Sequence, residues 1–108
     1  MHVLVTGAAG FIGPFLIRKL VNLGHTVHGA DRTPMDDLPL DETTRGDLAD
    51  SSVARAAMTD AECVCHLAAA RADWGLSEGE YYHDNLDATR TLIEAGRKEG
   101  VTDWVFYS

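Results

Sequence analysis

Residues 6–13 read Thr6-Gly7-Ala8-Ala9-Gly10-Phe11-Ile12-Gly13, a glycine-rich stretch that stands between a strand pattern and a helix pattern. Residues 2–6 form a short apolar run with β-branched side chains, typical of a buried parallel strand. After the stretch, apolar residues recur every three or four positions, which predicts an amphipathic helix that begins at Gly10 or Phe11 and stops at Gly24. The apolar positions are Phe11, Ile12, Phe15, Leu16, Leu20 and Leu23. Strand, glycine turn and helix in this order are typical of a dinucleotide-binding turn.

The glycines of this turn have different predicted roles. Gly7 permits the sharp turn, Gly10 the close approach of a ligand, and Gly13 the tight packing of helix on sheet. Backbone N–H groups at a helix N-terminus attract anions, and the helix dipole adds about half a positive charge. We therefore expect a pyrophosphate over Gly10 to Gly13, and a tight turn without a ligand is the alternative. The candidate binding positions are Gly7, Ala9, Gly10, Phe11, Ile12 and Gly13.

Further strands and helices are predicted along the rest of the chain. The strands are residues 26–30, ending at Asp31, then 43–46, 63–67 and 104–107. The helices are residues 53–58, capped by Asp50, Ser51 and Ser52, and residues 81–97, with Leu86, Thr89, Leu92 and Ile93 on one face and Gly100 as the stop. Residues 33–42 lack periodicity and are expected to form a surface loop. Strands that alternate with helices require right-handed crossovers, so we predict an α/β fold with a doubly wound parallel sheet of five strands. In a sheet of the Rossmann type, which the dinucleotide-binding turn favours, the expected strand order is 3-2-1-4-5.

Length and composition are those of one domain. The 108 residues are 45% hydrophobic and 24% charged, and we expect residues 1–108 to form a single domain with no second one. Nine Lys and Arg against 17 Asp and Glu give a net charge of −8, which repels nucleic acid and anionic membrane surfaces. No apolar run is long enough to span a membrane, and no targeting signal opens the chain. We therefore expect a cytoplasmic protein.

Cys63 and Cys65 lie two positions apart in an apolar run and predict neither a disulfide framework nor a metal site. An extended chain points both side chains to the same face of the sheet. A continuous strand cannot turn these two thiols and His66 onto one ion, whereas buried strand cysteines are ordinary small apolar residues. We therefore expect no bound metal.

Asp31 is the candidate ribose-binding residue. It lies 18 residues past Gly13 at the end of the second predicted strand, close to the interval of about 20 residues at which a carboxylate meets the adenosine ribose. A 2′-phosphate would meet a repelling charge there, which favours NAD over NADP. Arg32 complicates the choice, because a guanidinium can stack on adenine or pair with a 2′-phosphate. The alternative for Asp31 is a solvated turn carboxylate.

The spacing Gly-x-x-Gly-x-x-Gly resembles that of the extended short-chain dehydrogenase/reductases, and within them the NAD-dependent epimerase/dehydratase family, which includes the UDP-glucose 4-epimerases. The resemblance extends over residues 1–108, with a variable stretch at 34–44. Matches in the same order are the glycine turn, Asp31, Gly46-Asp47-Leu48, His66-Leu67-Ala68-Ala69, and Asn85 ahead of Thr89-Arg90-Thr91-Leu92-Ile93-Glu94-Ala95. The resemblance implies a Rossmann-type NAD-binding domain, of which this chain is the N-terminal and incomplete portion.

The resemblance also implies roles for residues around the adenine. Asp47 would accept a hydrogen bond from the adenine amino group, and Leu48 would pack on the ring. A helix-capping or turn aspartate is the alternative for Asp47.

For the nicotinamide half of the cofactor, the resemblance implies a second group of residues. Leu67, Ala68 and Ala69 would line the ribose and nicotinamide with small side chains and backbone. Arg71 matches a position near the pyrophosphate or substrate, and a solvated loop arginine is the alternative. Asn85 would order the active site, with an exposed helical asparagine as its alternative.

The family's general acid/base pair, Tyr-x-x-x-Lys, is absent from this sequence. Lys19 and Lys98 are the only lysines, so neither Tyr81 nor Tyr82 is followed by lysine at the required spacing. Ser108 stands where the family's catalytic hydroxyl is expected, at or just after this position. The substrate-binding region that the family carries after the cofactor domain has no counterpart here.

Two function classes follow from this resemblance. The first is the NAD-binding portion of a nucleotide-sugar epimerase/dehydratase-type enzyme, whose parent transfers hydride between nicotinamide and a nucleotide sugar or another carbonyl or hydroxyl substrate. The second is a stand-alone or vestigial dinucleotide-binding module without catalysis. In either class the last strand would expose Trp104 and Phe106, or Val105 and Tyr107, along an unpaired edge, so self-association into a homodimer is expected.

Overall fold

The protein, seen in a computed structural model that describes residues 1–68 and 83–107, is built on one parallel sheet. Its strand order is β3-β2-β1-β4-β5, as predicted. The strands are β1 (His2–Thr6), β2 (Thr26–Asp31), β3 (Glu42–Arg45), β4 (Cys63–His66) and β5 (Asp103–Phe106). Each differs from its predicted range by at most one residue at either end. The order places β1 in the centre, where the chain's direction of winding reverses.

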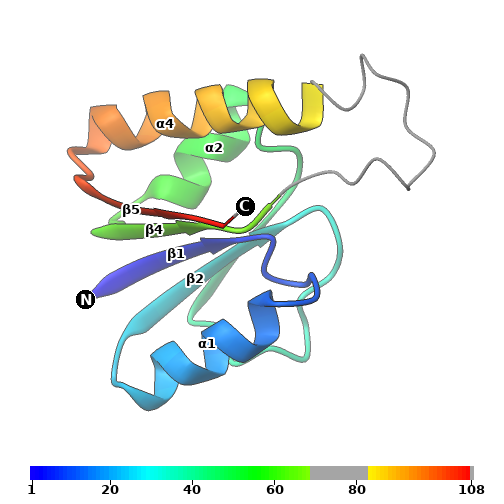
Figure 1. Cartoon of the computed structure of the whole chain (residues 1–108), viewed down its shortest axis with the longest axis vertical. Coiled ribbons are helices and arrows are strands. Elements are labelled where there is room, and N and C mark those ends of the chain that lie inside the picture. Colours follow the sequence, from blue (N-terminus) through cyan, green and yellow to red (C-terminus); the bar gives the residue numbers. More distant parts are fainter. Residues whose placement is uncertain (69–82, 108) are drawn as a thin grey trace.

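Helices cover the sheet on both faces (Figure 1). One face carries α1 (Gly13–Asn22), and the other carries α2 (Ser51–Met58) and α4 (Ala88–Glu99), which a π-helical turn, η2 (His83–Asp87), precedes. Each face has its own apolar core: Ile17 of α1 packs over Val3 and Val5 on one side, and Met58 and Leu92 pack over Leu4 on the other. Alternate residues of β1 therefore supply both cores, as a doubly covered parallel strand requires.

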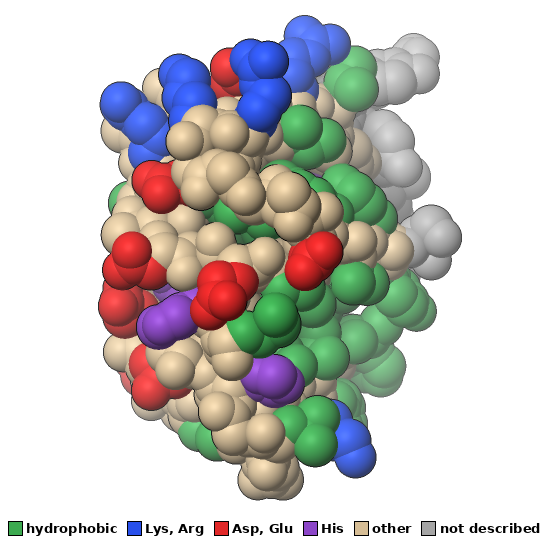
Figure 2. All heavy atoms as spheres, turned by 90° about the vertical axis from the view of Figure 1, so that its left-hand side faces the viewer, with side chains coloured by type: hydrophobic (Ala, Val, Ile, Leu, Met, Phe, Trp, Pro, Cys, Tyr) green, Lys and Arg blue, Asp and Glu red, His purple; other side chains and the backbone are tan. Residues whose placement is uncertain are grey.

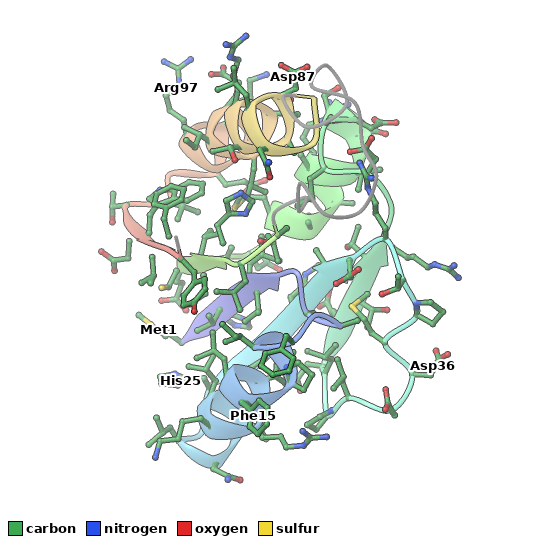
Figure 3. All side chains as sticks on the ribbon, turned by 45° about the vertical axis from the view of Figure 1, so that its right-hand side comes forward. Met1, Phe15, His25, Asp36, Asp87 and Arg97 are labelled. Carbon is green, nitrogen blue, oxygen red and sulfur yellow. The ribbon has the colours of Figure 1, made fainter. Side chains whose placement is uncertain are left out.

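The helix ends follow from local chemistry. Asp50 caps α2, since its Oδ1 accepts from the Ser52 N–H at 2.9 Å. Gly24 after α1 and Gly100 after α4 adopt positive φ, and Gly100 is the left-handed stop that the sequence predicts. Figure 3 shows Asp87 and Arg97 at opposite ends of α4, the arrangement of charges that the helix dipole favours.

The predicted buried face of the first helix is partly wrong. The helix begins at Gly13, two or three residues later than expected, and Phe11 in the preceding turn is 90% exposed. Phe15 is 72% exposed on α1 (Figure 3), and Leu23 is exposed too. The buried positions are Gly13 and Ile17, because only one narrow stripe of a helix faces a sheet.

The face of the last helix also differs from its prediction. Leu92 is buried and Thr89 is half-buried, but Leu86 and Ile93 are exposed. Small residues form much of the buried face, namely Ala88, Ala95 and Gly96. A Cβ on Gly96 would lie 2.4 Å from Cζ2 of Trp104, so the missing side chain makes room for that indole. Periodicity alone favours large apolar residues and overlooks such close packing.

The loop before β3 is more than a surface loop. Met35 is buried in the α1-side core, with Leu38 and Leu40 partly buried beside it. A Cβ on Gly29 of β2 would lie 2.5 Å from Cδ1 of Leu40, so the glycine leaves the space that this leucine fills. The loop therefore covers the edge of the sheet that α1 leaves open.

The amino-terminal ends of the strands form a charged end of the molecule. Figure 2 looks onto this end and shows Lys and Arg side chains gathered along the top, with Asp and Glu below them. The exposed basic residues of α4 are Arg90, Arg97 and Lys98, and Arg97 pairs with Glu94 at 2.8 Å. The candidate site lies at the other end of the sheet, where the carboxyl ends of the strands lead into the glycine turn and the loops after β2, β3 and β4.

Candidate functional site

The carboxyl ends of the strands meet at one edge of the sheet. Thr6 at the end of β1 is level with Ala30 of β2 and with His66 of β4, and Asp31 is level with Arg45 of β3. The segments that follow these strands are the glycine turn, residues 32–33, residues 46–48 and residues 67–68. In open α/β sheets ligands bind at this edge, in the crevice where the winding reverses.

Steric contacts explain two glycines of the turn. Gly7 has φ +67°, and a Cβ there would lie 2.8 Å from the Ala68 nitrogen, so the turn follows the β4 loop with backbone against backbone. A Cβ on Gly13 would lie 2.4 Å from the Ala8 carbonyl oxygen. Gly13 thus packs α1 against the glycine turn itself. Both glycines are necessary for the fold before any ligand is considered.

Gly10 differs from the other two glycines. Its N–H donates to the Gly7 carbonyl oxygen at 3.0 Å, and among the described residues a Cβ on it would meet only that oxygen, at 3.1 Å. The packing of residues 1–68 and 83–107 therefore excludes a side chain at Gly10 only weakly. That Gly10 leaves room for the close approach of a ligand stays a prediction.

The N-terminus of α1 presents backbone donors. In the part of the chain that the structure describes, the N–H groups of Phe11 and Ile12 have no protein acceptor. Ile12 is the N-cap of α1 and supplies no capping side chain, and Pro14 in the first turn has no N–H to satisfy. These donors and the helix dipole together favour an anion at this end of α1.

Asp31 is bonded to the glycine turn. Its Oδ2 accepts from the Ala9 N–H at 2.9 Å, and its Oδ1 accepts from the N–H and hydroxyl of Thr33 at 2.9 and 3.0 Å. The carboxylate is therefore held in a fixed position. Thr33 had no predicted role, although an Asp with Thr two residues later is a common turn pattern that could have indicated one.

Arg32 and Asp47 form an ion pair beside Asp31. The Arg32 Nη2 lies 3.2 Å from Asp47 Oδ1, which also accepts from the Ala49 N–H at 2.9 Å. The turn role that was the alternative for Asp47 is thus present. Leu48 is only 6% exposed and packs in the core next to α2 and α4, so its side chain offers little surface to a ligand.

A chain of hydrogen bonds connects β1, β4 and α4. The Ala68 N–H donates to Thr6 Oγ1 at 3.1 Å, and Thr6 Oγ1 lies 2.6 Å from His66 Nδ1. On the other side of the ring, His66 Nε2 lies 3.0 Å from Thr89 Oγ1, which donates to the Asn85 carbonyl oxygen at 2.6 Å. Burial lowers the pKa of His66 below its usual value.

The sequence analysis did not predict this row of hydrogen bonds. Thr6 and Thr89 had no predicted role as partners of His66, which entered as the first residue of a family match and as a rejected metal ligand. Its directly bonded members lie up to 62 residues apart in sequence. No local pattern in the sequence connects them.

The cysteines behave as apolar strand residues. Cys65 packs in the α1-side core, whereas His66 turns to the α4 side, so the three side chains do not converge. Burial, with the neighbouring Cys63 thiol, raises the pKa of Cys65 to about 11. Among the described residues no group of three potential ligands could hold a metal ion.

Several predicted residues lie outside the described residues: Ala69, Arg71, Tyr81, Tyr82 and Ser108. In residues 1–68 and 83–107, none of the helices has the length and apolar character needed to cross a membrane.

The chain is similar in sequence and structure to several known proteins. A 3 beta-hydroxysteroid dehydrogenase/Delta 5-->4-isomerase of Mycobacterium tuberculosis is 35% identical over 115 residues, covering 99% of this chain and 31% of that protein. MoeE5, solved in complex with UDP-glucose and NAD, is 38% identical with a TM-score of 0.84, over 98% of this chain and 36% of its own. UDP-glucose 4-epimerase from Bifidobacterium longum, solved with NAD+ and UDP, is 28% identical with a TM-score of 0.85, over 100% of this chain and 37% of its own.

The chain therefore spans about a third of the length of these relatives. The family model for the NAD dependent epimerase/dehydratase family matches residues 3–108, which is nearly the whole sequence. With the parallel sheet in the order β3-β2-β1-β4-β5 and the glycine turn at its carboxyl edge, the chain belongs to the NAD dependent epimerase/dehydratase family.

Proposed function

We propose that this chain is the NAD-binding portion of an epimerase/dehydratase-type enzyme that acts on a nucleotide sugar. The observation that carries the proposal is the junction of two features at the carboxyl edge of the sheet. The amides of Phe11 and Ile12 have no protein acceptor among the described residues, and the Asp31 carboxylate is bonded to Ala9 in the same turn. The first feature suits a pyrophosphate, and the second suits the adenosine ribose.

In this proposal the pyrophosphate lies over Gly10 to Gly13. The N–H groups of Phe11 and Ile12 would donate to its oxygens, and the N-terminus of α1 would add its partial positive charge. The absence of a side chain at Gly10 would let the phosphate oxygens come close to the backbone. Gly7 and Gly13 would contribute indirectly, by giving the turn its shape.

The environment of Asp31 supports NAD over NADP. A carboxylate offers about four lone-pair positions, and Ala9 and Thr33 occupy three of them. The remaining capacity suits a ribose hydroxyl, whereas a 2′-phosphate would place a second negative charge against the first. Arg32, which could relieve that repulsion, is paired with Asp47 at 3.2 Å.

The residues proposed to border the adenine and the nicotinamide of the cofactor also lie along the carboxyl edge of the sheet. Asp47 and Leu48 lie after β3, on the adenine side of Asp31, and Leu67, Ala68 and Asn85 lie beyond the glycine turn on the other side. NAD, when bound, supplies a carbon that accepts hydride from a hydroxyl-bearing carbon of the substrate. The chain's own residues would hold and orient it, with Ala69, Arg71 and Ser108 as further proposed contributors. MoeE5 and the epimerase were solved with uridine nucleotides, which supports a nucleotide-sugar substrate for the whole enzyme.

Calorimetric titration of NAD into Gly10→Leu tests the proposal. A leucine at this position meets little of the part of the chain that the structure describes, so the fold should persist while binding is lost. Gly24→Leu is the matched control: it introduces the same side chain at a positive φ in open space at the far end of α1, and it should lower stability but leave binding unchanged. Equal NAD affinity in wild type and folded Gly10→Leu, or no binding by the folded wild type, would refute the proposal.

The non-catalytic module remains the alternative function. The sequence contains no Tyr-x-x-x-Lys pair, so the chain by itself holds no acid/base pair of the family's kind. The coding sequence that follows Ser108 separates the two functions. A downstream Tyr-x-x-x-Lys supports the enzyme, and a stop codon supports the module.

A further inference from the structure

His66 lies in a buried position where each of its ring nitrogens meets one hydroxyl. It is 6% exposed, and Thr6, which it contacts, is fully buried. Phe106 of β5 meets the ring edge to face, with centroids 5.9 Å apart. Water therefore has little access to the imidazole, and the two threonines must satisfy it.

The donor and acceptor of each hydrogen bond from Ala68 through Thr6, His66 and Thr89 to Asn85 can be deduced. The Asn85 carbonyl oxygen can only accept, so the single hydroxyl proton of Thr89 points to it across 2.6 Å. Thr89 Oγ1 must then accept from His66 Nε2–H. On the other side, Thr6 Oγ1 accepts from the Ala68 N–H, and its own proton is left for His66 Nδ1. The ring is thus neutral, with its proton on Nε2.

We infer that His66, as this single tautomer, is a positioning residue of the cofactor site, which holds the Ala68 backbone and the η2 turn at Asn85 in fixed relation to the end of β1. This inference rests on the proposed NAD site, because Ala68 and Asn85 are proposed to border the nicotinamide half. The opposite tautomer would set Nδ1–H against Thr6 and leave Nε2 facing an oxygen with no proton to give. Thr89 would then have to turn its hydroxyl proton from the Asn85 carbonyl oxygen to His66 Nε2.

The row of hydrogen bonds from Ala68 through Thr6, His66 and Thr89 to Asn85, here called the relay, connects separate segments of the fold. Thr6 ends the central strand, Ala68 follows the neighbouring strand, and Asn85 precedes α4, so one imidazole couples three separate segments. Loss of one link should shift the others. This coupling distinguishes a relay from four independent hydrogen bonds.

A first experiment measures the ring nitrogens of His66 by nitrogen-15 NMR at neutral pH. A protonated Nε2 and an unprotonated Nδ1 are expected. The Nδ1–H tautomer, or an imidazolium, would overturn the inference. This measurement uses the wild-type chain, so it does not depend on how a variant folds or on whether NAD binds.

A second experiment compares NAD affinity among threonine variants of α4. Thr89→Val removes the hydroxyl that receives Nε2–H, and it should weaken NAD binding by about 3- to 10-fold and shift the amide signals of Ala68 and Asn85. Thr89→Ser should restore both. Thr91→Val is the matched control, because that hydroxyl bonds to the Ala49 carbonyl oxygen away from the relay.

The outcomes separate the two proposals. Thr89→Val that binds NAD as well as Thr91→Val, or that leaves the Ala68 amide unmoved, overturns the positioning role. If the wild-type chain binds no NAD, the proposed function fails, and the tautomer with the amide shifts then decides the relay alone.

Discussion

Asp31 shows how much one side chain contributes at the residue scale. It joins β2 to the glycine turn across 22 residues of sequence, through the Ala9 N–H, and it orders Thr33 at the same time. Hydrogen bonds to a charged group are worth about 1.5 to 3 kcal/mol each when they are well formed. The residue proposed to select the cofactor is therefore also a structural residue, and any variant of it tests both roles.

Replacement of Asp31 by Ser should move the preference toward NADP. The change removes the charge that repels a 2′-phosphate and leaves Arg32 in place, so the relative affinity should shift by about 1 to 3 kcal/mol. Titration of both cofactors into wild type and variant measures this shift. Asp36→Ser is the control, since Asp36 is an exposed carboxylate in the loop before β3 (Figure 3) and its loss changes the net charge equally. A wild type that already prefers NADP would contradict the role given to Asp31.

His66 should make the fold sensitive to acid. Burial lowers its pKa below the usual 6.5, so below that pH the unfolded chain binds more protons than the folded one. The free energy of unfolding should be unaffected by this group above pH 6.5, and should fall as the pH decreases from there toward the lowered pKa. Urea unfolding of wild type and His66→Gln at two pH values on either side of 6.5 measures the difference.

His28 provides the comparison for this experiment. Burial also lowers its pKa, but the charge of Glu42 opposes the shift. His28→Gln should therefore remove less of the acid sensitivity than His66→Gln. Equal loss of stability with pH in wild type and His66→Gln would show that the imidazole is not buried as described.

At the scale of elements, β5 is the strand least covered by the rest of the structure. Among the described strands it pairs only with β4. Val105 and Tyr107 are 54% and 60% exposed, and Phe106 is exposed as well, whereas Trp104 is half-buried against α4. Of the two pairs that the sequence offered as alternatives, Val105 and Tyr107 are exposed together. In the other pair Phe106 is exposed and Trp104 is not, because the missing side chain of Gly96 leaves room for the indole.

This edge should cause the 108-residue chain to self-associate as its concentration rises. An unpaired strand with apolar side chains offers hydrogen bonds and apolar surface to a second chain, and a charged side chain on the edge opposes such pairing. Sedimentation of wild type and Val105→Lys measures the effect, and the variant should remain monomeric. Leu23→Lys is the control, because Leu23 is similarly exposed at the end of α1. A monomeric wild type at high concentration would contradict the prediction.

At the scale of the whole molecule, this chain contains the proposed cofactor-binding edge but not the family's acid/base pair. The chain spans 31% to 37% of the three relatives compared, and it contains the edge of the sheet at which the cofactor is proposed to bind. The family's acid/base pair is absent from its sequence. We therefore expect binding and catalysis to be separable in experiment.

The 108-residue chain should show no turnover of UDP-sugars with NAD. A single positioned acid or base is typically worth about 10²- to 10⁴-fold in rate, and neither Lys19 nor Lys98 completes the pair. Absorbance of reduced nicotinamide and analysis of the sugar products measure turnover. A longer chain with a downstream Tyr-x-x-x-Lys is the positive comparison. Robust turnover by the short chain would overturn this division.

The sequence by itself determined the features that depend on neighbouring residues. The strand, glycine turn and helix at residues 2–22 follow from local composition, and so do the Asp50 cap and the stop at Gly100. The alternation of strands and helices was sufficient for a parallel doubly wound sheet. The order 3-2-1-4-5 needed the Rossmann-type assignment as well, because other doubly wound sheets obey the same handedness rules in a different order. Asp31 could be proposed as the ribose-binding residue because its distance from the glycine turn is a spacing along the chain.

Only the tertiary structure decided which distant groups meet. The bonds of Asp31 to Ala9 and of His66 to Thr6 and Thr89 depend on strand register and helix placement, which no short pattern encodes. The exposure of Phe11 also required the structure, because periodicity locates an apolar stripe but not the residue at which the helix starts. Contacts of 22 to 60 residues' separation exist only after the sheet has formed, and for this reason the sequence offers candidate residues for the site but not their hydrogen-bond partners.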